Sequence, residues 1–169
     1  MSVKVEIVKE MMVQRGFEEY KNGKDYLIGK SDSNTYIYIK IFMGKFELNI
    51  VREFLWSKFF VDATGNITFK RNNKQVVQLV IVCKSFQNSH VKEFKEISKN
   101  IQLIKSDFFN INITKKAPYH HKVENVNFNK REIPIIKDDD PNCIFYNFVK
   151  GDVIRVVRSN GDICYRLVR

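Results

Sequence analysis

The chain of 169 residues contains few residues that cross-link, bend or anchor a protein: 3 Cys, 3 Pro, 7 Gly and 1 Trp. Cys83, Cys143 and Cys164 are odd in number and form no C-x-x-C pair, which argues against a disulfide framework or a zinc site and favours a reducing compartment. No apolar run approaches the roughly 20 residues of a membrane-spanning helix, and the N-terminus lacks the apolar core of a signal peptide. We expect a soluble, unsecreted protein with no membrane partner.

Sequence patterns that carry catalysis or cofactor binding are also missing. The glycines fit neither G-x-x-x-x-G-K-[ST] nor G-x-G-x-x-G. His120 and His121 are adjacent, and neighbouring side chains of a strand point to opposite faces, so capping or packing is expected of them rather than joint chelation. The consecutive carboxylates of Asp138–Asp140 diverge in the same way. We expect no catalytic residue, no cofactor and no metal.

Apolar and basic residues are abundant instead. The hydrophobic content of 44% and the aromatic content of 13% predict a folded chain. Most of the net charge of +10 lies in the first part of the chain. Residues 1–117 hold 20 Lys and Arg against 12 Asp and Glu, whereas residues 118–169 hold 9 Lys and Arg against 7 Asp and Glu. A basic first part indicates nearness to nucleic acid, although a lysine-rich solubilising surface would give the same numbers.

Hydrophobic periodicity in the first part predicts helices alternating with buried strands, which is typical of a mixed α/β layer. Residues 18–34 are polar and rich in turn residues, and Asn22-Gly23 is a hairpin signal. Residues 115–118 are expected to form a linker. The expected helices are 3–15, 46–60 and 85–100, and the expected strands are 36–42, 67–69, 75–83, 101–105 and 107–114.

The last forty residues predict a small helix followed by a hairpin. Asp140-Pro141 is a helix start, because the carboxylate can accept first-turn N–H groups and proline suits the first helical position. Asn147 suits a left-handed helix end. Val153 to Arg158 is a β-branched strand, Asn160-Gly161 predicts a two-residue type I′ turn, and Ile163 to Val168 is the returning strand.

These residues also carry a resemblance to a known family. The stretch is similar to the C-terminal module of the fifth-largest subunit of eukaryotic nuclear RNA polymerases, a module that archaeal RNA polymerases carry alone as a small separate polypeptide. Ile144 and Asn147 depart from the family, which usually has a basic residue and a glycine there. The segment 7–17 resembles the opening helix of the eukaryotic, two-domain form. The residues that match the module are Pro134, Asp140, Pro141, Phe145, Tyr146, Lys150, Gly151, Val153, Arg158, Tyr165, Arg166 and Leu167.

The resemblance implies an α+β protein with an N-terminal mixed α/β jaw domain, residues 1–117, and a small assembly domain, residues 118–169, ending in a β-hairpin. It implies a non-catalytic subunit of a multisubunit DNA-directed RNA polymerase that docks on the largest subunit and forms part of the lower jaw near downstream duplex DNA. The residues implied in binding the largest subunit are Pro134, Asp140, Pro141, Tyr146, Lys150, Gly151, Arg158, Tyr165 and Arg166.

The short polar segment 18–34 and the abundance of Lys, Asn and Ile favour a homologue from a large DNA virus, placed in the host cytoplasm or the virion. A reduced cellular version in the nucleus is the alternative interpretation of the same composition. Composition does not separate the two origins.

In this family the first domain resembles the core of restriction-type endonucleases, whose active strand carries an acid-x-lysine motif. Here Val82 precedes Lys84 and Tyr38 precedes Lys40 at that spacing, so the carboxylate that would bind the metal is missing. We therefore expect an endonuclease-like core without an active site. The alternatives are a free-standing basic nucleic-acid-binding protein and, further off, a degenerate nuclease.

Overall fold

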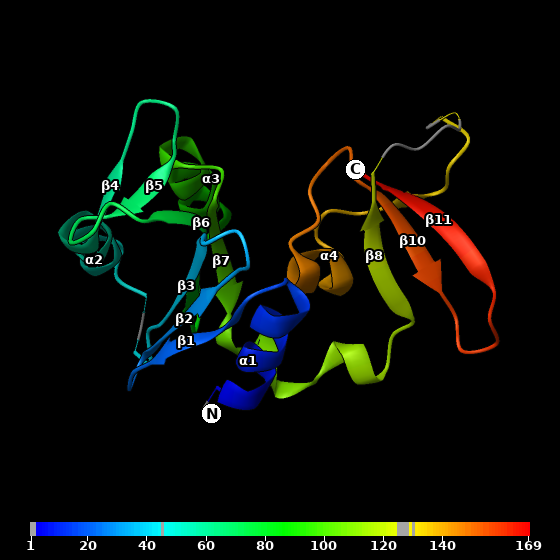
Figure 1. Ribbon diagram of the computed structural model, residues 1–169, viewed down its shortest axis with the longest axis horizontal. Coiled ribbons are helices and arrows are strands. Elements are labelled where there is room, and N and C mark those ends of the chain that lie inside the picture. The colour runs from blue at the N-terminus through cyan, green and yellow to red at the C-terminus, as the bar shows by residue number, and fades with distance from the viewer. Residues whose placement is uncertain (1–2, 45, 125–128, 130) are drawn as a thin grey trace. The chain divides into compact units, whose positions relative to one another are not determined.

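The computed structural model describes residues 3–44, 46–124, 129 and 131–169. The chain divides into two compact units, residues 1–110 and residues 111–169, called here the N-terminal unit and the C-terminal unit. The described residues form two mixed sheets, of seven and four strands, together with four α-helices, which confirms the α+β class (Figure 1). None of the helices in this part of the chain has the length and apolar content needed to cross a bilayer.

The N-terminal unit is built on the seven-stranded sheet, whose order is β1-β2-β3-β6-β5-β4, with β7 paired to β6 as well. The long strand β6 pairs in parallel with both β3 and β7 and forms the middle of the sheet, as its β-branched sequence predicts. The strands are β1 Glu18–Asn22, β2 Tyr26–Lys30, β3 Tyr36–Ile41, β4 Phe59–Val61, β5 Ile67–Phe69, β6 Gln75–Cys83 and β7 Ile101–Lys105.

Helices cover both faces of this sheet. On one face, α2 (Leu48–Lys58) and α3 (Asn88–Ile97) bury apolar side chains against Tyr38 and Leu79. On the other face, α1 (Val5–Gln14) lies so close to β2 that a Cβ added at Gly29 would meet the Met12 sulfur at 2.7 Å. Glycine is therefore required there for close packing rather than for a special backbone angle.

Two sequence predictions for residues 46–114 are wrong. The helix expected over 46–60 ends at Lys58, because Phe59 turns out as the first residue of strand β4. The strand expected over 107–114 is replaced by two short 3-10 helices, Ser106–Asn110 and Ile113–Lys115. The Asn112 side chain accepts a hydrogen bond from the Thr114 N–H at 3.0 Å, so a local polar bond starts the second of them where a strand would need extended backbone.

In the described residues the C-terminal unit is a four-stranded sheet of order β8-β10-β11-β9 with one α-helix. Asp140 caps that helix by accepting from the Asn142 N–H at 2.8 Å, and Asn147 ends it at φ +59°, as predicted. The short strand β9 joins β11 in parallel. The elements are β8 Tyr119–Val123, β9 Ile135–Ile136, α4 Pro141–Tyr146, β10 Val153–Val157 and β11 Ile163–Val168.

The β10–β11 hairpin forms as predicted, but its turn is of a different type. A type I′ turn needs positive φ at both central residues, and here Gly161 has φ +87° while Asn160 does not. The Gly161 N–H donates to the Arg158 carbonyl and the Arg158 N–H donates to the Asp162 carbonyl, both at 2.9 Å. The connection is thus a three-residue loop with glycine in the left-handed position.

Candidate partner interface

The two faces of the C-terminal sheet are covered differently. One face packs against α4, where Cys143 lies in an apolar cluster with Ile154, Val156 and Val168 (Figure 1). Burial and the nearby carboxylates, Asp140 first among them, raise the pKa of the Cys143 thiol to about 12. This face is an ordinary core that holds helix and sheet together.

The opposite face carries three rows of side chains that run across the strands, and we call it the open face. Cross-strand partners share a face of the sheet, so the register of the ladders defines each row. The first row is Tyr119, Val157 and Ile163; the second is His121, Arg155 and Tyr165; the third is Val123, Val153, Leu167 and Ile135.

The open face is apolar yet incompletely covered by the described residues. Ile133 packs on it beside Val153 and Leu167, which are buried. At its ends, however, Tyr119 is 57% exposed and Ile135 is 54% exposed. An antiparallel sheet with one solvated face normally alternates apolar and polar residues, and strand β10 does not do so. Large apolar side chains left in water in this way are typical of a surface that binds another protein.

Two residues of the middle row, His121 and Arg155, carry polar groups without partners in the described structure. The Nδ1 atom of His121 is buried and has no hydrogen-bond partner in the described part of the chain, and its ring lies 5.4 Å from that of Tyr119. Arg155 forms no ion pair with a described residue. An unsatisfied buried nitrogen costs free energy, so a partner that offers hydrogen-bonding or acidic groups here would stabilise the row.

His120 behaves differently from its neighbour, because the two rings point to opposite faces as the strand alternation predicts. His120 pairs with Val156 on the α4 side, and its Nδ1 donates to the Pro118 carbonyl at 2.6 Å. This bond fastens the start of β8.

The residues implied in binding the largest subunit begin around α4. The Pro134 carbonyl accepts from the Leu167 N–H at 2.9 Å, which fixes the segment that leads into β9. Asp140 and Pro141 form the cap and the first helical position. At the other end of the helix the Tyr146 ring stacks on Phe148, with centroids 5.3 Å apart.

The remaining implied residues lie in the turn and hairpin. Lys150 forms an ion pair with Asp138 at 3.4 Å, and Gly151, at φ +94°, donates to the Val168 carbonyl at 3.0 Å. Arg158 is exposed beside the hairpin turn. Tyr165 lies on the open face, whereas Arg166 pairs with Ile154 on the α4 side. The structure thus spreads the implied residues over both faces of the sheet.

Other chemistry-bearing residues take separate places. The consecutive aspartates 138–140 do not act as one group: Asp138 forms an ion pair with Lys150, and Asp140 caps α4. On β3, Lys40 forms an ion pair with Asp25. Among the described residues, no group of three or more His, Cys, Asp and Glu is placed to hold a metal ion.

The open face itself was not predicted as a set of residues. Tyr119, Ile135 and Ile163 come from three separate strands, and only the pairing register shows that they share a surface. The one signal in the sequence is strand β10, whose apolar residues occur on both faces.

Comparison with known proteins gives one full-length relative. The chain is 63% identical over 171 residues to a protein of Invertebrate iridescent virus 3, described as uncharacterized protein 092R, and the match covers 99% of this chain and 100% of the relative. No family model matches the sequence.

Proposed function

This chain belongs to the same family as protein 092R of Invertebrate iridescent virus 3, and we propose that it serves a virus as a non-catalytic subunit of a multisubunit DNA-directed RNA polymerase. In this role the C-terminal unit docks on the largest subunit. The N-terminal unit forms part of the lower jaw near downstream duplex DNA. The protein carries no chemistry of its own and acts in the host cytoplasm or the virion.

The observation that carries the proposal is the open face. A small sheet that leaves Tyr119, Ile135 and Ile163 exposed on one side is suited to permanent assembly with a larger protein. The side chains of His121 and Arg155 in the middle row, which have no hydrogen-bond or ion-pair partner among the described residues, add groups that fix the register of a partner more than they raise its affinity. The ordered matches to the polymerase module between Pro134 and Leu167 supply the choice of partner.

The N-terminal unit supports the jaw role through its charge and its layers. Residues 1–117 hold 20 Lys and Arg against 12 Asp and Glu, which favours sequence-independent attraction to phosphates. The parallel β3, β6 and β7 with helices on both faces are compatible with an endonuclease-like core, in which Val82 and Tyr38 take the place of the metal-binding acid. We therefore propose that this unit has the endonuclease-like fold without the nuclease activity.

The test is an affinity pulldown of the tagged protein from infected cells, with mass spectrometry of what is recovered. The unaltered chain is expected to bring down the two largest polymerase subunits. The variant Ile135→Asp/Ile163→Asp places two charges on the open face and should reduce their recovery at least about tenfold, because burying an unpaired carboxylate costs several kcal/mol. A second variant, Tyr165→Ala/Arg166→Ala, tests two of the residues that the resemblance implies in binding the largest subunit.

The matched control is Ile111→Asp/Val149→Asp, which makes the same substitution at two exposed apolar positions of the same unit, 56% and 54% exposed, outside the open face. This control should keep full recovery. Equal loss in both doubles would show that the effect is not specific to the open face. Recovery of nucleic acid without any polymerase subunit would overturn the proposal in favour of a free-standing nucleic-acid-binding protein.

A further inference from the structure

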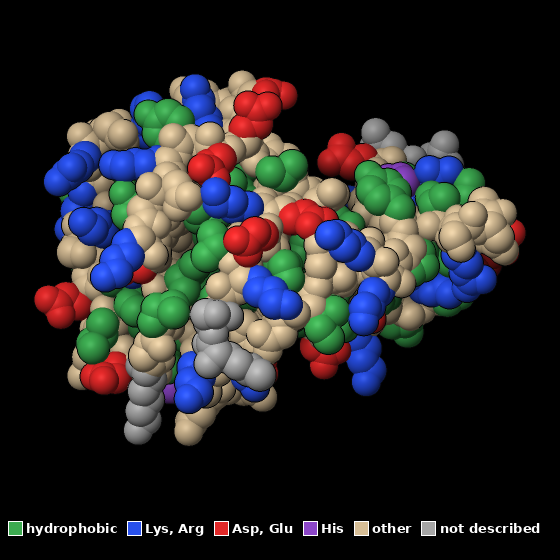
Figure 2. All heavy atoms as spheres, turned by 90° about the horizontal axis from the view of Figure 1, so that it is seen from below, with side chains coloured by type: hydrophobic (Ala, Val, Ile, Leu, Met, Phe, Trp, Pro, Cys, Tyr) green, Lys and Arg blue, Asp and Glu red, His purple; other side chains and the backbone are tan. Residues whose placement is uncertain are grey.

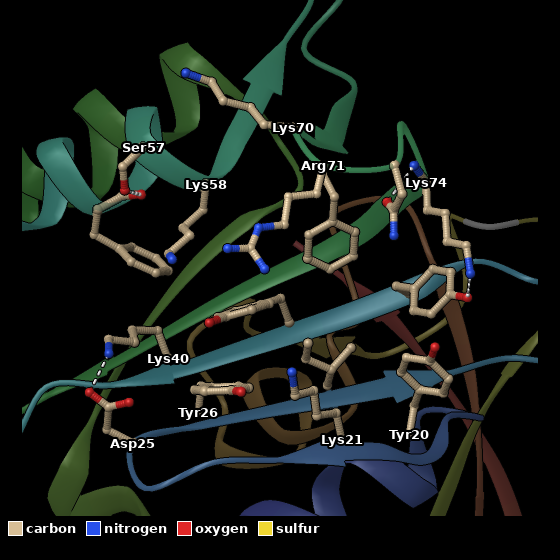
Figure 3. A pocket seen from close by; sticks show the side chains of 16 residues that line it. Tyr20, Lys21, Asp25, Tyr26, Lys40, Ser57, Lys58, Lys70, Arg71 and Lys74 are labelled. Carbon is tan, nitrogen blue, oxygen red and sulfur yellow. Dashed lines mark hydrogen bonds and ion pairs between the residues drawn. The ribbon is translucent and has the colours of Figure 1, made fainter.

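The N-terminal unit holds a cavity of about 600 Å³ between the β1–β2–β3 strands on one side and α2 with the end of β5 on the other (Figure 3). Its lining is basic, and Asp25 is the only carboxylate among the described residues that line it. Figure 2 shows several Lys and Arg side chains at the left of the view, the end of this unit that carries α2 in Figure 1. The cationic lining residues are Lys21, Lys40, Lys58, Lys70, Arg71 and Lys74.

Most of this positive charge is not neutralised by the described residues. Asp25 is occupied by Lys40. In the described part of the chain, Lys21, Lys58 and Arg71 have no ion-pair partner. Figure 3 shows the side chains of Lys58 and Arg71 reaching into the cavity from the α2 and β5 side. The cavity therefore presents free cations to whatever enters it, which favours an anionic ligand.

Aromatic rings form the rest of the lining. The rings of Tyr26 and Tyr38 stack with centroids 5.6 Å apart at 13°. Tyr20 contacts Tyr36 in a T-shaped arrangement with ring centroids 5.6 Å apart, and because Tyr20 is 57% exposed, much of its ring is accessible to a ligand. The Lys74 Nζ lies 5.9 Å from the Tyr20 ring centroid and donates to the Tyr36 hydroxyl at 2.9 Å. Exposed tyrosine beside free cations is the combination that binds a base and its phosphate.

A β-bulge places two of these groups on the same side. Consecutive residues of a regular strand point to opposite faces, yet Tyr20 and Lys21 both line the cavity. The register explains this, because Glu19 pairs with Gly29 and Lys21 pairs with Ile28, which leaves Tyr20 as the additional residue. Bulges re-aim side chains and occur often beside binding sites. Figure 3 shows both side chains rising from β1 into the cavity.

We propose that this cavity binds a nucleotide unit of single-stranded nucleic acid, with the base against Tyr20 and the phosphate among Lys21, Lys58 and Arg71. A paired base in a duplex has both faces stacked on its neighbours, so the duplex offers a protein groove edges and phosphates but no ring face. An unpaired nucleotide offers a ring face as well, and only such a unit uses both the tyrosine and the cations. The site goes beyond the proposed subunit role and does not depend on a polymerase partner.

The experiment is fluorescence anisotropy of the full chain with a labelled ten-nucleotide oligo(dT) at low and at physiological salt. Lys58→Gln/Arg71→Gln should raise the dissociation constant at least about tenfold, and the salt dependence should weaken because fewer counterions are released. Tyr20→Leu should raise it about fivefold or more through loss of stacking, whereas Tyr20→Phe should stay close to the unaltered chain. Circular dichroism of each variant checks that the fold is kept.

The matched control is Lys92→Gln/Lys95→Gln, which removes the same charge from exposed positions of α3 outside the cavity. It should change the affinity less than about threefold, as expected for screened long-range attraction. Equal weakening in the two doubles, or a duplex of the same length binding as well as the single strand, would overturn the proposal. Competition by free thymidine monophosphate distinguishes a site for a free nucleotide from one for a strand. The polymerase pulldown does not depend on the result of this binding experiment, so the two proposals can fail separately.

Discussion

At the scale of single residues, Asp62 is the clearest acid-sensitive group. Its carboxylate accepts hydrogen bonds from the Thr64 hydroxyl at 2.6 Å, the Thr64 N–H at 2.8 Å and the Asn66 N–H at 3.0 Å, and these bonds lower its pKa to about 2. Since the folded pKa lies below the unfolded value of about 4, the carboxylate stabilises the β4–β5 turn above pH 4, and this contribution is lost as the pH falls towards 2.

NMR titration of the Asp62 carboxyl carbon measures this pKa. The midpoint is expected near pH 2 in the unaltered chain and higher in Thr64→Val, which removes the hydroxyl donor that contributes most to the shift. A midpoint near pH 4 in the unaltered chain would show that the turn does not hold its bonds in solution.

The three cysteines differ in their expected reactivity. Burial raises the pKa of Cys83 to about 11 and that of Cys143 to about 12, so both thiols stay protonated and enclosed at pH 8. Cys164 is only partly buried. A thiol-reactive dye at pH 8 is expected to label Cys164 first, with the other two reacting only as the protein opens. The assay contradicts this order if Cys164→Ser leaves the fast phase unchanged.

At the scale of elements, the start of α4 offers a direct test of capping. Asp140→Ala removes the acceptor for the Asn142 N–H and is expected to lower the free energy of unfolding by about 1 kcal/mol. Asp139→Ala makes the same change in charge one residue earlier, at an exposed position that caps nothing in the described structure, and should stay within about 0.5 kcal/mol. Urea denaturation followed by circular dichroism compares the two. Equal effects would assign the loss to charge rather than to the cap.

Local chemistry made some elements predictable from the sequence. The cap at Asp140, the left-handed Asn147 and the strand β6 each depend on residues adjacent in the chain, and the structure confirms them. Strand β1 was missed because all its residues are exposed, so it carries no apolar alternation. Its Tyr20 bulge is set by pairing with β2, which no local pattern records. The open face and the basic cavity likewise depend on register between distant strands.

At the scale of the whole molecule, each unit has an apolar core of its own. The large cluster around Tyr38 and Phe59 uses residues of the N-terminal unit alone. The clusters around Cys143 and around Ile133 use residues of the C-terminal unit alone. A core that closes within one segment allows that segment to fold independently.

Expressed separately, residues 1–110 and residues 111–169 are therefore each expected to give dispersed NMR spectra that superimpose on the full-length spectrum away from the junction. A collapsed spectrum for 111–169 would show instead that this small unit needs its neighbour or a partner to cover the open face, since domains of this size are marginally stable. Adding the 1–110 fragment to the 111–169 sample distinguishes these two causes, because only a requirement for the neighbouring unit would be met by it.

The pairing order of the C-terminal sheet also bears on how the protein is made. A ribosome releases β8 and β9 before β10 and β11, yet β8 pairs only with β10 and β9 only with β11 among the described strands. Neither outer strand can therefore form its pairing in the sheet until the hairpin between β10 and β11 has left the exit tunnel. We therefore expect this segment to expose unpaired strand edges to chaperones during synthesis, and its sheet to form late.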